Sequence, residues 1–320
     1  MSDYSVERTC VQLRKLVDVA VERNSARGVL LSGGLDSSIV AAVASRNLKL
    51  TGFTVSLGEA PDVKFAKAVA EKFSIDHIMI PIDEKVAESA TQNAVKIMNS
   101  FDPMEIRNDA TILIGLQAAK DHGIREVMTG DAGDELFAGY SFLFDRSRDE
   151  LVKSLRKMWS VMRFASASIA KSLRMTAKMP FLDEALKEFA MSIDPKLKIR
   201  KEHGQTYGKW ILRRTFDGIL PPEIVWRIKM PIERGSGTSM LPSYFSSRIS
   251  DDEFSKKTKE YLRSAGVRIR DKEHLFYYEA YEREFGSPRG FGEGSKICRG
   301  CGAYLLEVMD FCRICGASPA

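Results

Sequence analysis

The chain has 320 residues, of which 44% are hydrophobic, so it can bury a sizeable core as one large domain or two closely packed ones. Its formal net charge of +5 comes from 48 basic and 43 acidic residues spread along the chain, which permits a polyanionic partner without requiring one. There is no apolar run of about 18 residues, and the start, MSDYSVERTC, lacks the order of a signal peptide, so we expect a cytoplasmic protein with no membrane partner.

The first part of the chain alternates between helical and extended patterns. An amphipathic helix is predicted over 6–24, because its apolar residues recur at helical spacing. Short apolar or alternating runs predict strands at 28–31, 50–57, 77–82 and 126–129. Further helices are predicted between these strands at 36–46, 61–73, 84–99 and 108–122. This order predicts a parallel, doubly wound α/β sheet that binds ligands outside the carboxyl ends of its strands.

Beyond Tyr140 the pattern becomes mostly helical, with turn-like interruptions at 179–183 (MPFLD) and 220–223 (LPPE). The stretch GSPRGFGEGSK has the composition of a linker and precedes a cysteine-rich tail. We therefore divide the chain into an α/β core with an N-terminal helix (1–140), a helical part (141–285), a linker (286–296) and a cysteine ribbon (297–320).

The string SGGLDSS, from Ser32 to Ser38, lies between a predicted strand and a predicted helix and favours a loop that grips the phosphates of ATP. Its glycines let the backbone approach phosphate oxygens, and the helix N-terminus favours negative charge. Asp36 would repel phosphates unless a cation mediates, so it is a candidate Mg²⁺ ligand. The loop has no lysine for the terminal phosphates, which favours attack at the α-phosphate. An ordinary strand-to-helix turn is the alternative interpretation.

A second polar segment, TGDAGDELFAGY, follows the predicted strand at 126–129. Its carboxylates Asp131, Asp134 and Glu135 would repel one another unless a metal or a cationic substrate lies among them. By itself the segment could equally be an acidic, solvated loop at the start of a helix. Its expected position beside the SGG loop favours a role in the ATP site.

Four of the five cysteines lie in the tail as two CxxC pairs, each followed by glycine. Such pairs can hold one tetrahedral ion with thiolate ligands, most readily zinc, on Cys298, Cys301, Cys312 and Cys315. The metal would supply most of the folding energy of so short a segment. A structural role is the main interpretation, and redox chemistry or an iron–sulfur cluster are the alternatives. A ribbon of this type also suits docking of a protein, with nucleic acid as the less favoured partner.

Together these segments resemble the synthetase domain of the asparagine synthetases, members of the PP-loop ATP pyrophosphatases. The resemblance covers about Val6 to Ser250 and follows the family's order through 53–62 (FTVSLGEAPD), 106–107 (IR), 134–140 (DELFAGY), 179–183 (MPFLD) and 212–229 (LRRTFDGILPPEIVWRIK). It implies a five-stranded sheet of the adenine-nucleotide α-hydrolase-like (HUP) type. It also implies an ATP-dependent amide ligase, in which a carboxylate attacks the α-phosphate, pyrophosphate leaves, and ammonia or another amine displaces AMP.

The resemblance also implies roles for individual residues. Lys229 would meet the charge that builds on the α-phosphate, although a surface lysine is the alternative. Arg107 would neutralise a substrate carboxylate or phosphate, or else pair with Asp109 or its neighbours. Mg²⁺ on the leaving pyrophosphate would be held by Asp36 and Asp134. The ATP-binding set would be Leu31, Ser32, Gly33, Gly34, Asp36, Ser37, Ser38, Val55, Thr129 and Gly130.

Three departures from the family pattern concern the acceptor chemistry. Asp131 stands where the family has a glutamate proposed as the base for ammonia, and its side chain is one methylene shorter. Lys178 replaces the arginine that usually precedes the PFLD turn. Glutamine-using members begin with an amidotransferase domain, whereas here Met1 is followed by Ser2 and a helix. We therefore expect free ammonia, another amine or a separate glutaminase as the nitrogen source.

Two other functions compete with the carboxylate ligase, for which aspartate is the default substrate. In the first, a tRNA-modifying enzyme adenylates a base; it predicts a broad basic face and cysteines near the ATP loop, where only Cys10 precedes the tail. In the second, a nucleotide-binding regulatory protein has lost catalysis and uses its tail to bind a partner. Retention of Asp36, Asp134 and Lys229 favours the ligase.

Overall fold

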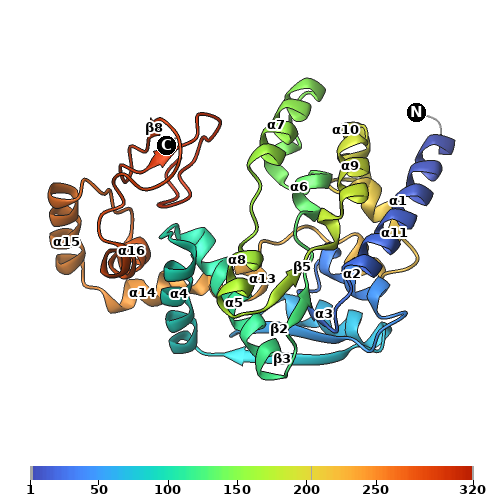
Figure 1. Cartoon of the computed structure of the whole chain (residues 1–320), viewed down its shortest axis with the longest axis horizontal. Coiled ribbons are helices and arrows are strands. Elements are labelled where there is room, and N and C mark those ends of the chain that lie inside the picture. Colours follow the sequence, from blue (N-terminus) through green and yellow to red (C-terminus); the bar gives the residue numbers. More distant parts are fainter. Residues whose placement is uncertain (1–2, 203, 319–320) are drawn as a thin grey trace. The chain divides into compact units, whose positions relative to one another are not determined.

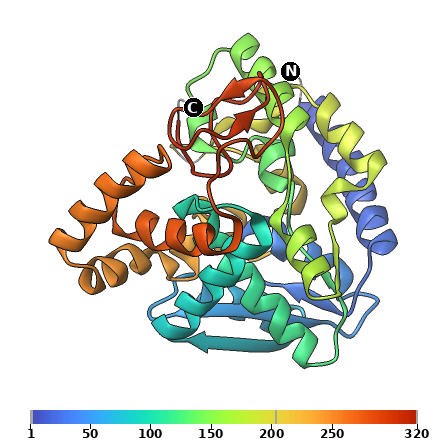
Figure 2. The same cartoon turned by 60° about the vertical axis from the view of Figure 1, so that its left-hand side comes forward.

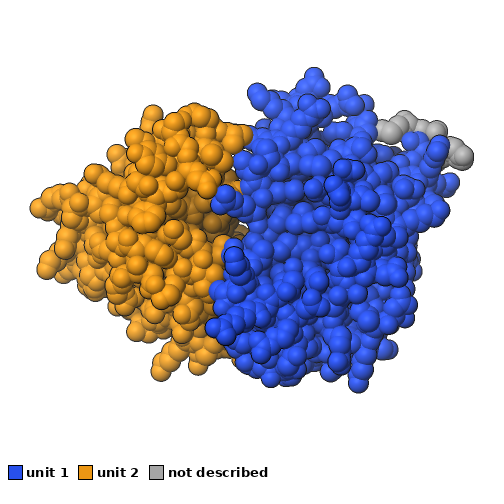
Figure 3. All heavy atoms as spheres, in the orientation of Figure 1, with its two compact units in different colours: residues 1–55, 61–80, 115–231 blue, residues 56–60, 81–114, 232–320 orange. Residues whose placement is uncertain are grey.

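The computed structural model describes residues 3–202 and 204–318. The chain divides into two compact units, shown in different colours in Figure 3. Unit 1 comprises residues 1–55, 61–80 and 115–231. Unit 2 comprises residues 56–60, 81–114 and 232–320. The cysteine ribbon therefore belongs to the same unit as residues 81–114 and 232–296. This grouping differs from the four consecutive parts into which the sequence analysis divides the chain.

A five-stranded sheet is formed by segments between residues 28 and 178, in the order β3-β2-β1-β4-β5 (Figure 1). The strands are β1 (Gly28–Leu30), β2 (Thr51–Leu57), β3 (Asp76–Ile82), β4 (Glu126–Met128) and β5 (Thr176–Lys178). Pairing is parallel between β1 and β2, between β1 and β4, and between β4 and β5. The α/β fold with a doubly wound parallel sheet is thus confirmed. Strand order reverses between β1 and β4, so the loops after these two strands flank the switch point where such sheets bind ligands.

Apolar helices pack on the sheet in unit 1. In α2 (Leu35–Ala44) nine of the ten residues are buried, because the helix lies among β1, α1 (Asp3–Arg23) and α3 (Asp62–Lys72). The remaining elements of this unit are α6 (Gly133–Phe137), η1 (Ser141–Leu143), α7 (Arg148–Val161), α8 (Ala165–Ser172), η2 (Pro180–Leu182), α9 (Glu184–Ser192), α10 (Pro195–Lys198), β6 (Arg200–Glu202), β7 (Gln205–Tyr207), α11 (Trp210–Phe216) and α12 (Pro222–Val225).

Unit 2 has its own core, built around three tyrosines of one helix, Tyr277, Tyr278 and Tyr281, none of them exposed. That helix is α16 (Lys272–Phe285), which packs on α4 (Glu84–Met98) and α14 (Leu241–Arg248). The unit also holds α13 (Ile232–Gly235), η3 (Thr238–Met240), α15 (Asp251–Ser264), β8 (Lys296–Ile297) and β9 (Tyr304–Leu305). The two cysteine pairs lie in the same buried cluster as the tyrosines.

Two elements differ from the sequence-based expectation. Helix α5 (Pro103–Asp121) begins at Pro103 rather than at Asn108, because proline suits a first helical position and Asp102 Oδ1 accepts the N–H of Met104 at 3.3 Å. Strand β5 has no periodic pattern of its own and becomes a strand by pairing with β4. The ribbon also reaches upstream, since Gly292 forms a bridge with Tyr304. Among the described residues no helix is long and apolar enough to cross a membrane.

Candidate active site and metal centre

The SGG loop follows β1 and turns sharply into α2. Gly33 has φ +67°, and a Cβ there would lie 2.4 Å from the backbone nitrogen of Ala66 in α3. Only glycine combines this backbone conformation with so close an approach. The helix cap, Gly34, has no side chain to satisfy the first amides of α2, so these amides remain available to an anion.

Serine hydroxyls line the same loop. The Oγ atoms of Ser32 and Ser37 lie 2.9 Å apart, and the N–H of Gly34 donates to Ser32 Oγ at 3.3 Å. Ser38 is fully buried, and its Oγ has no hydrogen-bond partner in the part of the chain that the structure describes. A buried hydroxyl without a partner costs free energy unless a ligand bonds to it. These hydroxyls therefore suit phosphate oxygens, as the sequence predicts.

The acidic loop after β4 packs directly on the SGG loop. A Cβ on Gly130 would lie 2.7 Å from the backbone nitrogen of Ser37, and one on Gly133 would lie 2.4 Å from Asp36 Cγ. The two glycines let the loops approach without a side chain between them. The structure thus brings together the two segments that the sequence analysis singled out separately.

Lys209 joins the carboxylates of the two loops. Its ammonium, on a side chain only 5% exposed, contacts Asp36 Oδ2 and lies 2.8 Å from Asp134 Oδ1. Lys229 contacts the other carboxylate oxygen of Asp134, with Nζ 2.7 Å from Oδ2 and 4.6 Å from the ring centroid of Tyr140. Two ammonium groups therefore balance two carboxylates at the carboxyl edge of the sheet.

The charges of this cluster depend on one another. Burial by itself would raise the pKa of Asp134, but Lys209 and Lys229 lower it to about 2. Burial raises the pKa of Asp36, an effect that Lys209 opposes and Asp134 reinforces. Burial would lower the pKa of Lys209, but the two carboxylates raise it. Asp134 is therefore an anion throughout the physiological range, held by two cations.

The carboxylates of this cluster fit a divalent cation. Asp36 Oδ1 is buried and has no hydrogen-bond partner among the described residues. An unpartnered carboxylate oxygen next to a second carboxylate is the oxygen donor set that Mg²⁺ prefers. The pair predicted for Mg²⁺, Asp36 and Asp134, thus lies together, with Lys209 as a neighbour that the sequence analysis did not identify.

The other acidic residues of the loop are held by hydroxyl groups. Asp131 Oδ2 accepts a hydrogen bond from Thr129 Oγ1 at 2.9 Å and another from Ser166 Oγ. Burial raises the pKa of Asp131 although these two bonds act in the opposite direction. Glu135 accepts the hydroxyl of Tyr140 at 2.6 Å, and burial raises its pKa as well. Asp131 is therefore fixed in orientation and is more basic than an exposed aspartate.

Two arginines hold the segment that carries Lys229. Arg213 of α11 donates to the carbonyl of Gly208 at 2.9 Å and to the carbonyls of Val225 and Arg227, the second at 2.9 Å. Arg227 donates to the carbonyl of Gly33 at 3.3 Å and pairs with Asp62 of α3. Through these bonds the SGG loop and the Lys229 segment are tied together. Arg213 lies in the sequence stretch LRRTFD and Arg227 in WRIK. From these two stretches the sequence analysis assigned a role to Lys229 alone.

Other residues of the predicted ATP-binding set, Leu31, Val55 and Thr129, lie in or next to the strands β1, β2 and β4. The N–H of Leu31 donates to the carbonyl of Phe53 at 2.9 Å, so this amide is used inside the sheet. The carbonyl of Leu31 accepts the hydroxyl of Thr54 and has a second lone pair available to a ligand. Val55 is buried in β2, and the N–H of Thr129 donates to Lys178 at 2.9 Å. Lys178 itself pairs with Glu126 at 3.1 Å.

Arg107 belongs to unit 2, within α5. Its Nη1 lies 2.5 Å from Glu273 Oε2 of α16, and Tyr277 donates to the other oxygen of that carboxylate at 2.9 Å. Burial raises the pKa of Glu273 to about 7, although Arg107 opposes the rise. The partner of Arg107 is thus Glu273, a residue far away in sequence, and no sequence pattern points to the pair.

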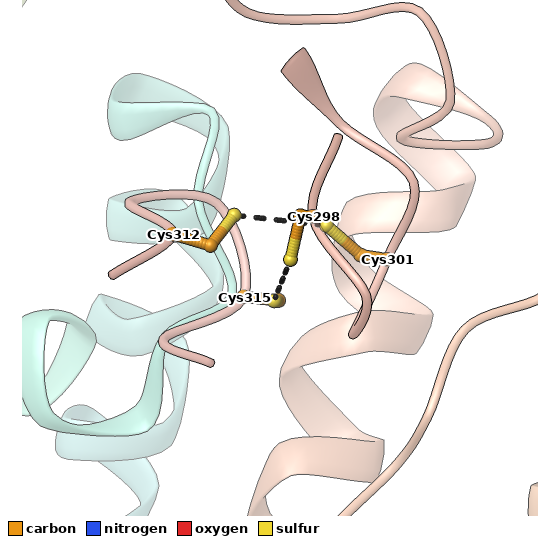
Figure 4. Close-up of side chains that lie close together, drawn as sticks. All are labelled: Cys298, Cys301, Cys312 and Cys315. Atoms are coloured by element: carbon orange, nitrogen blue, oxygen red, sulfur yellow. Dashed lines mark hydrogen bonds between the residues drawn. The ribbon is translucent and has the colours of Figure 1, made fainter. Parts of the chain in front are cut away.

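The four tail cysteines converge on one point (Figure 4). Their sulfur atoms all lie within 4.8 Å of one another, with Cys298 and Cys315 3.6 Å apart and Cys301 and Cys312 3.7 Å apart. Sulfurs at about 2.3 Å from a central tetrahedral ion lie about 3.8 Å from one another, so this spacing fits zinc. Each pair closes with a left-handed glycine: Gly302 (φ +76°) donates to the carbonyl of Cys298, and Gly316 (φ +72°) donates to that of Cys312.

Comparison with known proteins gives the context of this site. The family model described as asparagine synthase matches residues 12–174 and 166–297, which together cover most of the chain. The chain belongs to the asparagine synthase family. Among curated relatives, glutamine-hydrolysing asparagine synthetases of Brassica oleracea and Asparagus officinalis are each 30% identical over 284 residues, covering 81% of this chain and 47% of the relative. The chain thus spans about half the length of these relatives.

Solved structures are more distant in sequence. The NMN synthetase of Francisella tularensis aligns at a TM-score of 0.41 with 15% identity, covering 88% of this chain and 95% of that one. Membership of the asparagine synthase family rests on the sequence matches and extends across both units.

Proposed function

We propose that the protein is an AMP- and pyrophosphate-forming amide ligase that adenylates a carboxylate, with aspartate as the default substrate and ammonia as the nitrogen donor. The main support is the contact between Lys229 and Asp134 beside the SGG loop, at the switch point of the sheet. A protein that only binds nucleotide has no need of a lysine held at that edge. The preserved pair therefore favours catalysis over the regulatory alternative.

Different residues of unit 1 would bind the phosphates, hold the metal and stabilise the transition state of adenylation. Amides of the SGG loop and the hydroxyls of Ser32, Ser37 and Ser38 would bind phosphate oxygens of ATP. Mg²⁺ on Asp36 and Asp134 would neutralise the leaving pyrophosphate. Lys229 would stabilise the charge that develops on the α-phosphate, and loss of one such contact costs about 3 kcal/mol of barrier, or roughly a hundredfold in rate.

The second step needs a base for the attacking amine. We propose Asp131 for this role, because its raised pKa and the two hydroxyls that orient it suit proton transfer at neutral pH. Arg107 is our candidate for neutralising a substrate carboxylate or phosphate. Zinc on the four cysteines completes the cofactor set, and the use of the thiols as ligands fits a reducing, cytoplasmic location.

Whether the protein needs a partner protein depends on its source of nitrogen. We propose that the amine is free ammonia or ammonia supplied by a separate glutaminase. A glutaminase partner would show itself as glutamine-dependent activity that appears only when the second protein is added.

The test is pyrophosphate release from ATP and Mg²⁺ by purified protein, with aspartate plus ammonium and with each omitted in turn. We expect release that requires both substrates and falls at least a hundredfold in Lys229→Ala. The matched control is Lys49→Ala, which removes an exposed lysine of the same unit and should leave the rate unchanged. Release that does not depend on aspartate would overturn the assignment of substrate. Equal rates in the two variants would overturn the role of Lys229.

A further inference from the structure

The cysteine ribbon forms hydrogen bonds with other segments of unit 2 and is not a separate arm. Phe101 donates its N–H to the carbonyl of Ile314 at 2.7 Å, and Ser100 Oγ donates to that of Arg313 at 2.7 Å. Both bonds join the second cysteine knuckle to the segment 100–102, which directly precedes α5. Figure 2 shows the ribbon, in red, over α16 and the start of α5.

Arg270 attaches the same knuckle from another direction. Its guanidinium donates to the carbonyl of Gly316 at 2.8 Å and to that of Cys315 at 2.9 Å. The N–H of Arg268 donates to the carbonyl of Gly300 in the first knuckle at 2.8 Å. The segment that leads into α16 therefore bonds to both knuckles, so the ribbon links the start of α5 to the start of α16.

Close packing reinforces these bonds. Phe101 is fully buried, with its ring centroid 5.2 Å from that of His274, 5.1 Å from that of Tyr278 and 4.9 Å from that of Tyr281. The four cysteines belong to the same buried cluster. A Cβ on Gly316 would lie 2.3 Å from Asp102 Oδ1, so the knuckle touches the carboxylate that caps α5.

Arg107 lies one turn into α5, and its partner Glu273 lies in the first turn of α16. Both groups line a cavity of about 550 Å³ whose other walls include Arg270 and, from the ribbon, Phe311 and Gly316. The ribbon thus bounds the space next to Arg107 and is bonded to the segments that begin both helices of the ion pair.

We propose that the metal-loaded ribbon acts as a structural clamp that fixes the start of α5 and holds Arg107 in its pair with Glu273, with Ser100, Phe101 and Arg270 as positioning residues. Without the ion, the four thiols lose the bonds that define the knuckles, and the carbonyls of residues 313–316 lose their fixed positions. Metal occupancy then controls the order of the Arg107 segment. The consequence for catalysis rests on the role proposed above for Arg107.

The test is amide hydrogen exchange on the full chain, zinc-loaded and after removal of zinc by EDTA, with metal content measured in parallel. We expect exchange in peptides covering 100–107 and 270–275 to accelerate by about tenfold or more, while peptides of α2 in unit 1 keep their protection. Unchanged protection at 100–107 after full loss of zinc overturns the proposal. Exchange needs no substrate, so this result is separate from the ligase assay, whose failure in the loaded protein would refute only the proposed function.

Variants test the clamp without touching the metal ligands. Arg270→Ala removes the two bonds to the second knuckle, and Arg268→Ala is its control because the Arg268 side chain is exposed and the bond to Gly300 comes from the backbone. We expect faster exchange at 100–107 in Arg270→Ala, with zinc retained, and no change in Arg268→Ala. Equal exchange in the two variants overturns the proposal. A separate pair of variants removes a metal ligand: Cys312→Ser should lose zinc and the protection at 100–107, whereas its control, Cys10→Ser, should retain both.

Discussion

Lys209 offers the sharpest test of how the two acidic loops are held together. Its ammonium contacts both Asp36 and Asp134, and its side chain is 5% exposed. Lys209→Met keeps the aliphatic stem but leaves two buried carboxylates with Lys229 as the remaining cation on Asp134. Removing one partner of a buried ion pair costs about 3–5 kcal/mol. At roughly 2–4 °C per kcal/mol, we expect the Tm to fall by about 10 °C.

Divalent metal gives the second half of this test. In Lys209→Met the two carboxylates lack their shared cation, so Mg²⁺ should bind them more tightly and restore part of the lost stability. At a concentration 100 times its Kd, a ligand stabilises by about 2.7 kcal/mol. The assay is thermal unfolding with and without Mg²⁺, with Lys49→Met as the control. A Tm equal to that of the control, or a Mg²⁺ effect no larger than in the unmodified protein, would refute the reasoning.

Three further predictions concern neighbouring groups. Gly133→Ala should weaken ATP binding in a calorimetric titration, because its methyl would displace Asp36 at a packing cost of about 1–3 kcal/mol; unchanged affinity contradicts this. Asp131→Asn should lower ammonia-dependent product formation by about a hundredfold or more, and Asp131→Glu should not; equal rates would remove Asp131 as the base. Burial lowers the pKa of Lys198 to about 7, so between pH 7 and 9 only the unfolded chain binds this proton. As the pH is raised from 7 to 9, the free energy of unfolding should therefore rise by about 2–3 kcal/mol more than it does in Lys198→Met. Parallel pH profiles of stability for the two proteins would argue against this prediction.

Sequence periodicity predicted the first four strands and the helices between them, because each of these elements has a hydrophobic face of its own. It also located the SGG loop, the acidic loop and the four cysteines, whose residue types are tied to their chemistry over a few positions. The start of α5 was placed late, since Pro103 and Asp102 act through a cap rather than through periodicity. Strand β5 was missed because its three residues become a strand only through pairing with β4.

By itself, the sequence determined which groups are candidates for the chemistry: the SGG loop for phosphates, two carboxylates for a cation, a lysine after WRI, and four thiols for a metal. Tertiary structure alone decided how these groups are held. Lys209 lies 173 residues from Asp36, and Glu273 lies 166 residues from Arg107, so neither pair leaves a local pattern in the chain. In the sequence the cysteine ribbon has the pattern of a separate tail, yet in the structure it forms hydrogen bonds with the segment before α5. The physical reason is that buried charges and carbonyls take whatever partner the folded chain brings within hydrogen-bond distance, and sequence spacing does not encode that choice.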